Sequence, residues 1–154
     1  MSESLLLKDD FSSGDFSKWS GMAAGKFDVS VVKKLDNNYA KFTCSAAVHL
    51  SIEHSYVYKS LRSLLGKTAS AVTAIGDFRI AASGMTEHGH WLHLIEAVSS
   101  GGNVLASADV FLDGTTMVWG LSVNPNEEDR FYLFSSPDAT SNPLLKRWYT
   151  VGLH

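Results

Sequence analysis

The chain has 154 residues, of which 45% are hydrophobic and 19% are charged, and its formal net charge is −3. This composition is that of a globular protein rather than a disordered one. The small negative charge gives no electrostatic reason to expect a nucleic acid or an anionic membrane as partner. The length predicts a single domain over residues 1–154.

The cysteine count and the hydropathy pattern exclude two further classes. Cys44 is the one cysteine in the sequence, so no disulfide forms within the chain. No apolar stretch approaches the roughly 20 residues of a membrane-spanning helix. The opening residues, MSESLLLKDD, lack a basic leader and are not read as a signal peptide. Localisation is therefore not fixed by a signal in this sequence.

The first half of the chain reads as short strands. SLLLKDDF and KFDVSVVKK are rich in β-formers and are separated by SSGDFSKWSGMAAG, a segment that bears glycine and serine. A DNN turn precedes the partly alternating run YAKFTCSAAVHLSIE. In SYVYKSLRSLL the first residues favour a strand and the leucine spacing favours a helix, which predicts a strand that runs into a short helical turn.

The second half continues this pattern with longer strands. The predicted strands lie in ASAVTAIGDFRIAAS, HWLHLIEAVS, NVLASADVFLDGTTMVWGLSVN, RFYLFSS and RWYTVGLH, with PDATSNPLLK as a loop before the last of them. No long amphipathic helix, internal repeat or low-complexity tract interrupts them. Eight to ten short strands joined by polar turns predict an all-β protein, an antiparallel β-sandwich.

A hairpin at Asp113-Gly114 is the clearest local unit, because this dipeptide joins two β-rich runs. We expect Leu112 to pair with Thr115 across the hairpin. This pair then sets the register of the two strands. One face then forms a core of Val104, Ala106, Ala108, Val110, Leu112, Met117, Trp119, Leu121 and Val123. The other face, which we expect to be solvated, carries Ser107, Asp109, Phe111, Thr116, Val118, Gly120 and Ser122.

Several of these pieces, taken in order, resemble one fold family. DDFSSGDFSKWSG, DNNYAKFTC, YVYKSL, GNVLASADVFLDGTTMVWGL and RWYTVGLH are similar to successive segments of the concanavalin A-like lectin/glucanase jelly roll, in its laminin G-like and polysaccharide-lyase-like group. The resemblance implies a jelly roll, and an extracellular, cell-surface or virion location. In that group the strand at WYTV is followed by a further hairpin and closing strands, so the last strands of the fold are absent here. This would leave the N-terminal strand SLLLKDDF or its neighbour without a partner in the sheet. We expect a fold that is truncated, compacted, or completed by a strand of a neighbouring subunit.

Metal sites are weakly indicated. His88, His90 and His93 lie close together, but on a strand His88 and His90 would share a face while His93 points away. The zinc motif H-E-x-x-H is absent. A loose acidic loop of Asp9, Asp10 and Asp15 leaves a structural calcium open beside the default of polar turns, because calcium prefers several oxygen ligands. We predict no other cofactor.

Catalytic motifs are also absent from the sequence. Glycosidases of the resembled fold carry a compact Glu-x-Asp-x-x-Glu motif, which this chain lacks. A lyase-like set of Arg79, His90 and Tyr132 can be assembled, but no local motif supports it and the chain contains no glutamine. No G-x-S-x-G elbow, P-loop or Rossmann fingerprint is present. Enzyme activity is therefore left open, with a non-catalytic function favoured.

Binding is the remaining function class. Sugars are bound by aromatic faces together with polar side chains that hydrogen-bond the hydroxyls. The predicted glycan-binding residues, on the concave sheet face, are Asp109, Phe111, Ser107, Ser122, Arg79, His90, Glu96 and Tyr132. The competing interpretation of this face is a solvated sheet surface, or one buried against a neighbour.

The sequence thus predicts a non-catalytic, lectin-like module that binds a glycan or polysaccharide. One alternative is a structural subunit of a surface layer, filament or virion, completed by strand pairing between subunits as a homo-oligomer. A second alternative is a polysaccharide lyase or glycosidase. Neither a nucleic acid nor a membrane span is expected.

Overall fold

The computed structural model describes residues 5–24, 27–35, 38–44, 55–67, 71–81, 83, 85, 91–124, 130–134 and 142–154. The chain forms two compact units, Met1–Ser70 and Ala71–His154. The expectation of one domain over residues 1–154 stays a prediction. No helix in the described ranges is long and apolar enough to cross a membrane.

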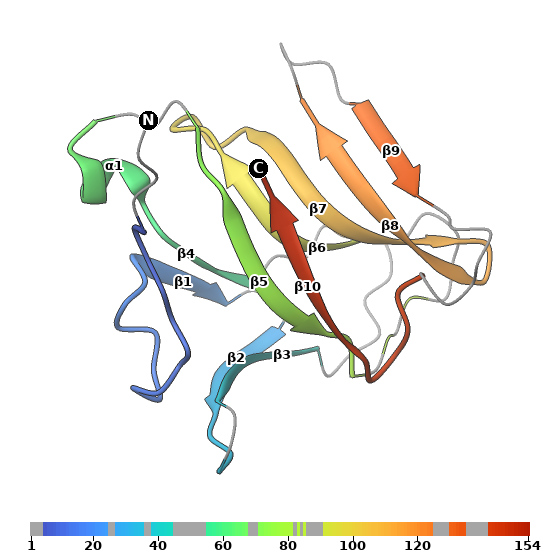
Figure 1. The fold of residues 1–154 in the computed structure, drawn as a ribbon, viewed down its shortest axis with the longest axis horizontal. Coiled ribbons are helices and arrows are strands. Elements are labelled where there is room, and N and C mark those ends of the chain that lie inside the picture. The colour runs from blue at the N-terminus through green and yellow to red at the C-terminus, as the bar shows by residue number, and fades with distance from the viewer. Residues whose placement is uncertain are drawn as a thin grey trace. The chain divides into compact units, whose positions relative to one another are not determined.

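The described chain is built from antiparallel strands and one short helix, so the all-β prediction is confirmed (Figure 1). Every strand pairing is antiparallel. The elements, in chain order, are β1 (Gly21–Ala24), β2 (Phe27–Val32), β3 (Tyr39–Cys44), β4 (Ser55–Tyr58), α1 (Leu61–Leu65), β5 (Ala74–Arg79), β6 (Trp91–Val98), β7 (Val104–Asp113), β8 (Thr116–Val123), β9 (Arg130–Phe134) and β10 (Trp148–Leu153).

The first unit contains two strand pairs, β1 with β4 and β2 with β3. The predicted strand that runs into a helical turn is confirmed as β4 and α1. Ser60 caps this helix by accepting a hydrogen bond from Ser63 N–H, and Gly66 ends it in the left-handed conformation. The segment between the first two predicted strands contains a strand of its own, β1, and all four of its residues pair with β4. The sequence did not predict this strand.

The predicted strand SLLLKDDF is also wrong where the structure describes it, from residue 5 to residue 11. Asp9 Oδ1 accepts a hydrogen bond from Phe11 N–H at 2.9 Å, and Asp10 Oδ1 accepts one from Ser12 N–H at 3.1 Å. Such short-range bonds offer the backbone an alternative to a sheet ladder. They turn the chain here, and Phe11 adopts a positive φ of 55°.

Asp9 is the anchor of this turn. Its side chain is only 2% exposed, and its Oδ2 accepts a hydrogen bond from Trp19 Nε1 at 2.8 Å. Lys18 Nζ lies 3.3 Å from Oδ1. The rings of Phe11 and Trp19 are nearly parallel, with centroids 6.5 Å apart. The left-handed backbone of Phe11 is therefore held by the hydrogen bond from its N–H to Asp9 and by the packing of its ring against Trp19.

The second unit contains a four-stranded sheet with the order β6-β7-β8-β9, and a separate β10-β5 pair. Tyr149 and Val151 of β10 lie on the half-buried face of that pair, and the Tyr149 ring meets Trp119 of β8 edge-to-face at 5.1 Å. Figure 1 shows β5 and β10 crossing one face of the sheet. The terminal strand RWYTVGLH is thus paired with β5 along its full length.

The predicted hairpin is present, but its register differs by two residues from our prediction. Asp113 pairs with Thr116 and Leu112 pairs with Met117, so the two-residue loop is Gly114-Thr115. Gly114 has a φ of 60°, whereas Thr115 is not among the residues with positive φ. This pattern matches a turn with glycine at its first central position. A shift of two residues preserves the side-chain faces, so the predicted division into two faces is confirmed.

The burial of those two faces corrects a second prediction. Val110, Leu112 and Ala108 are buried, as expected of the core face. The face expected to be solvated is buried along β7 as well, since Asp109 and Ser107 are 0% exposed and Phe111 and Val118 are also buried. Polar side chains can occupy such a position because they hydrogen-bond to one another, as described below.

The anchoring role of Asp9 is testable by substitution. We expect Asp9→Ala to lower the free energy of unfolding by about 2 kcal/mol, because it leaves the Phe11 and Trp19 N–H donors without their buried acceptor. Urea titration followed by circular dichroism measures this loss. Asp10→Ala is the matched control, because the Asp10 side chain is 68% exposed, and it should leave stability nearly unchanged. Equal losses in the two variants would contradict the anchoring role.

Candidate functional site

The candidate site is built on β6 and β7, where a bulge brings three charged side chains onto one face. His93 pairs with Asp109, and Glu96 pairs with Ser107, while the register shifts between His93 and Ile95. In a regular strand, residues three apart point to opposite faces. The extra residue of the bulge cancels this difference, so His93 and Glu96 share the face that carries Asp109 and Ser107.

Asp109 is the centre of a side-chain hydrogen-bond network. Its Oδ1 lies 2.6 Å from His93 Nδ1. Its Oδ2 accepts hydrogen bonds from Ser107 Oγ at 3.0 Å and from Ser122 Oγ at 2.9 Å. The carboxylate is fully buried, and these three partners come from β6, β7 and β8. A buried charge needs such partners, because desolvation would otherwise disfavour it strongly.

The network fixes the orientation of His93. An ionised carboxylate only accepts hydrogen bonds, so His93 Nδ1 carries the proton that is shared with Asp109. The other ring nitrogen, Nε2, then remains for a further partner. The side chain of His93 is 44% exposed, and Glu96 Oε1 lies 3.7 Å from its Nδ1. A buried acid therefore holds a half-exposed imidazole, an arrangement found at binding and catalytic sites.

The charge of His93 depends on these neighbours. The hydrogen bond to Asp109 raises the pKa of His93 above its ordinary value, and the charges of Asp109 and Glu96 act in the same direction. Partial burial of the ring opposes this effect. The hydrogen bond is the largest contribution, so the protonated form of His93 is favoured in the folded protein.

Aromatic side chains lie beside this network. Trp91 is two residues before His93 on the same face of β6, and the two rings are nearly parallel with centroids 6.4 Å apart. Phe111 of β7 pairs with Trp91 and packs against it at 4.5 Å. Phe111 is buried and Trp91 is half-buried. We call Trp91, His93 and Glu96 the β6 patch.

The structure brings together five of the eight predicted glycan-binding residues. Asp109, Ser107 and Ser122 form the hydrogen-bond network, Phe111 supports Trp91, and Glu96 lies in the β6 patch. His93, which holds the central position, was not among them. Regular alternation from Trp91 places His93 opposite Asp109, but the sequence does not show that β6 pairs with β7 in this register. The bulge that brings Glu96 to the same face has no signal in the sequence either.

The other three predicted residues do not join this group. The β9 register places Tyr132 opposite Leu121, on the face of the sheet away from Asp109. Arg79 lies on β5, where its Nε donates to the carbonyl of Lys146 at 3.1 Å. His90 lies outside the described residues, as do His88, His49 and His54.

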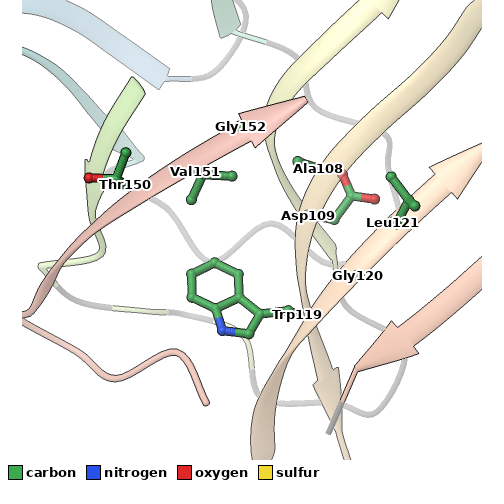
Figure 2. Close-up of a pocket in the computed structure, with 8 residues that line it drawn as sticks. All are labelled: Ala108, Asp109, Trp119, Gly120, Leu121, Thr150, Val151 and Gly152. Carbon is green, nitrogen blue, oxygen red and sulfur yellow. The ribbon is translucent and has the colours of Figure 1, made fainter. Parts of the chain in front are cut away.

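A cleft lies on the opposite face of the same sheet, between β10 and the β7–β8 pair (Figure 2). Its volume is about 340 Å³, and Figure 2 shows the indole of Trp119 and the side chain of Val151 beside it. The lining residues are Ala108, Asp109, Trp119, Gly120, Leu121, Thr150, Val151 and Gly152. The Thr150 hydroxyl already donates to Asp77 at 2.6 Å, and the Asp109 carboxylate is bound within the network. The β6 patch therefore offers more polar groups to a ligand than this cleft does.

The aspartates considered as calcium ligands accept hydrogen bonds from nearby N–H groups of the chain. Asp9 accepts from Phe11 and Trp19, and Asp15 Oδ1 accepts from Ser17 N–H at 3.0 Å. Within the described ranges, no group of three His, Cys, Asp or Glu side chains is arranged to hold a metal ion. Structural calcium stays a prediction from the sequence.

The raised pKa of His93 predicts how stability changes with pH. The protonated His93 side chain should stabilise the fold fully below about pH 6.5, the pKa of histidine in the unfolded chain. This stabilisation should be lost as the pH rises through the higher pKa of His93 in the folded protein. We expect the difference in melting temperature between the wild type and His93→Gln to shrink over that rise. Thermal unfolding followed by circular dichroism at a series of pH values measures it. A difference that is constant or grows with pH would contradict the assignment.

Comparison with known proteins does not identify a family for this chain. No family model matches the sequence, and no curated protein or solved structure matches it. The function is therefore argued from the chemistry of the β6 patch and the network beneath it.

Proposed function

We propose that the second unit is a non-catalytic, lectin-like module that binds glycan at the β6 patch, within a sandwich of the concanavalin A-like jelly-roll type. The sheet β6-β7-β8-β9 and the β5–β10 pair packed against it support a sandwich. One observation carries the functional proposal. A fully buried Asp109, bound by two serines, holds a half-exposed His93 next to Trp91.

The β6 patch supplies the groups that a sugar needs. The Trp91 ring offers an apolar face for the C–H surface of a pyranose. His93 Nε2 and the Glu96 carboxylate can exchange hydrogen bonds with hydroxyl groups. Because Asp109 and Phe111 fix His93 and Trp91 before a ligand arrives, little side-chain entropy is lost on binding.

Binding fits this arrangement better than hydrolysis does. Glycosidases hold two carboxyl groups on either side of the scissile bond, and each must reach the substrate. Asp109 is 0% exposed, and both of its oxygens accept hydrogen bonds from the protein. Its role is to position His93. Within the β6 patch, Glu96 is the carboxylate with access to a ligand.

The glycan-binding proposal is tested with a glycan array followed by calorimetry on the best ligand. We expect Trp91→Ala and His93→Ala each to weaken binding about tenfold or more, since each removes a direct contact. Trp148→Ala is the matched control, because Trp148 is a 44%-exposed tryptophan on β10, outside the patch. No glycan bound by the wild type, or equal losses in all three variants, would refute the proposal.

The β5–β10 pair favours a second candidate function, self-assembly as a structural subunit. In the described part of the chain this sheet has only two strands, so each has an edge without a strand neighbour. Ile75, opposite Gly152, is 70% exposed on its outer face. A two-stranded sheet that exposes an isoleucine, and whose described edges have no strand neighbour, can pair with a second copy of the chain.

Self-assembly is tested by size-exclusion chromatography with light scattering. We expect the wild type to form oligomers whose fraction rises with concentration, and Ile75→Lys to reduce that fraction several-fold because it places a charge in the contact. Leu35→Lys is the matched control, since Leu35 is fully exposed in the first unit. A wild type that stays monomeric at every soluble concentration would exclude this candidate.

A further inference from the structure

We propose that Glu96 makes the β6 patch selective for charge, so that glycans carrying ammonium groups bind more tightly than neutral glycans and uronate glycans bind least. This inference rests on the glycan-binding function proposed above and adds the class of sugar. It is carried by the placement of one imidazole between two carboxylates.

The charges of the patch do not cancel. His93 Nδ1 lies 2.6 Å from Asp109 Oδ1 and 3.7 Å from Glu96 Oε1. With His93 protonated, these three groups sum to −1, and with His93 neutral they sum to −2. The three groups together are therefore negative in either state. A ligand carboxylate would meet like charge here, and an ammonium group would meet opposite charge.

Glu96, rather than Asp109, conveys this charge to a ligand. Asp109 is fully buried, and its oxygens accept from His93, Ser107 and Ser122. The Glu96 side chain is 28% exposed. Its separation from His93 Nδ1 exceeds the length of a direct hydrogen bond, so its oxygens retain the capacity to accept from a ligand. The bulge in β6 is what places this carboxylate beside His93.

The test compares three oligosaccharides of equal length and linkage, made of glucosamine, glucose or glucuronate. Calorimetry at about pH 6 keeps the amine protonated and the uronate ionised. For the wild type we expect the glucosamine ligand to bind about tenfold more tightly than the glucuronate ligand, with the glucose ligand between them. Glu96→Gln keeps the shape of the side chain and should bring the three affinities to within about threefold of one another. Raising the salt concentration should also shrink the wild-type ratio.

Asp77→Asn is the matched control, because it removes one negative charge from the second unit on the side of the sheet away from the patch. Asp77 is exposed on the outer face of the β5–β10 pair, which covers the opposite face of the sheet. It should leave the wild-type ratio unchanged. If sugars bind but the order is reversed, or if Glu96→Gln and Asp77→Asn shift the ratio equally, the charge selectivity is refuted while glycan binding stands. If none of the three ligands nor any array glycan binds, both proposals fail.

Discussion

The interaction on which the second unit depends is the hydrogen bond between His93 and the buried carboxylate of Asp109. A carboxylate removed from water is costly unless donors surround it, and taking away one partner of a buried pair typically costs about 3–5 kcal/mol. Asp109 has three side-chain donors from three adjacent strands. The register of β6, β7 and β8 therefore depends on the hydrogen bonds to the Asp109 carboxylate. It also depends on the packing of apolar side chains around Val110 and Val118.

The same network gives the sheet two different faces. On one side, Trp119 packs against Tyr149 of β10, and the β5–β10 pair covers the sheet. On the other side, Asp109 and Ser107 are buried, while His93 at the edge strand of the described sheet remains half-exposed. A buried polar group that is fully hydrogen-bonded is rigid, and it can hold an exposed neighbour in one orientation. The network therefore supports ligand binding at His93, and Asp109 is the residue that positions the imidazole ring.

The first unit uses a carboxylate in a comparable way. Asp9 is almost fully buried. It accepts hydrogen bonds from the backbone N–H of Phe11 and the indole N–H of Trp19, and it lies beside the ammonium group of Lys18. Its effect is local, because its partners lie within ten residues along the chain. The sequence showed the acidic residues and the nearby serines and glycine, which favour turns. It did not show that Asp9 would accept from the Trp19 indole, since that contact depends on how the turn folds back.

The sequence by itself determined the β-rich class, most of the strands, the hairpin between β7 and β8, and the division of that hairpin into two faces. These follow from local preferences and from the two-residue period of a strand, which neighbouring residues suffice to reveal. Only the tertiary structure decided the turn at Gly114-Thr115, the bulge that brings Glu96 to the face of His93, and the pairing of β10 with β5. It also decided that the face expected to be solvated is buried along β7. The bulge and the pairing of β10 with β5 depend on groups far apart in the chain, and a bulge of one residue is enough to exchange the faces of a strand.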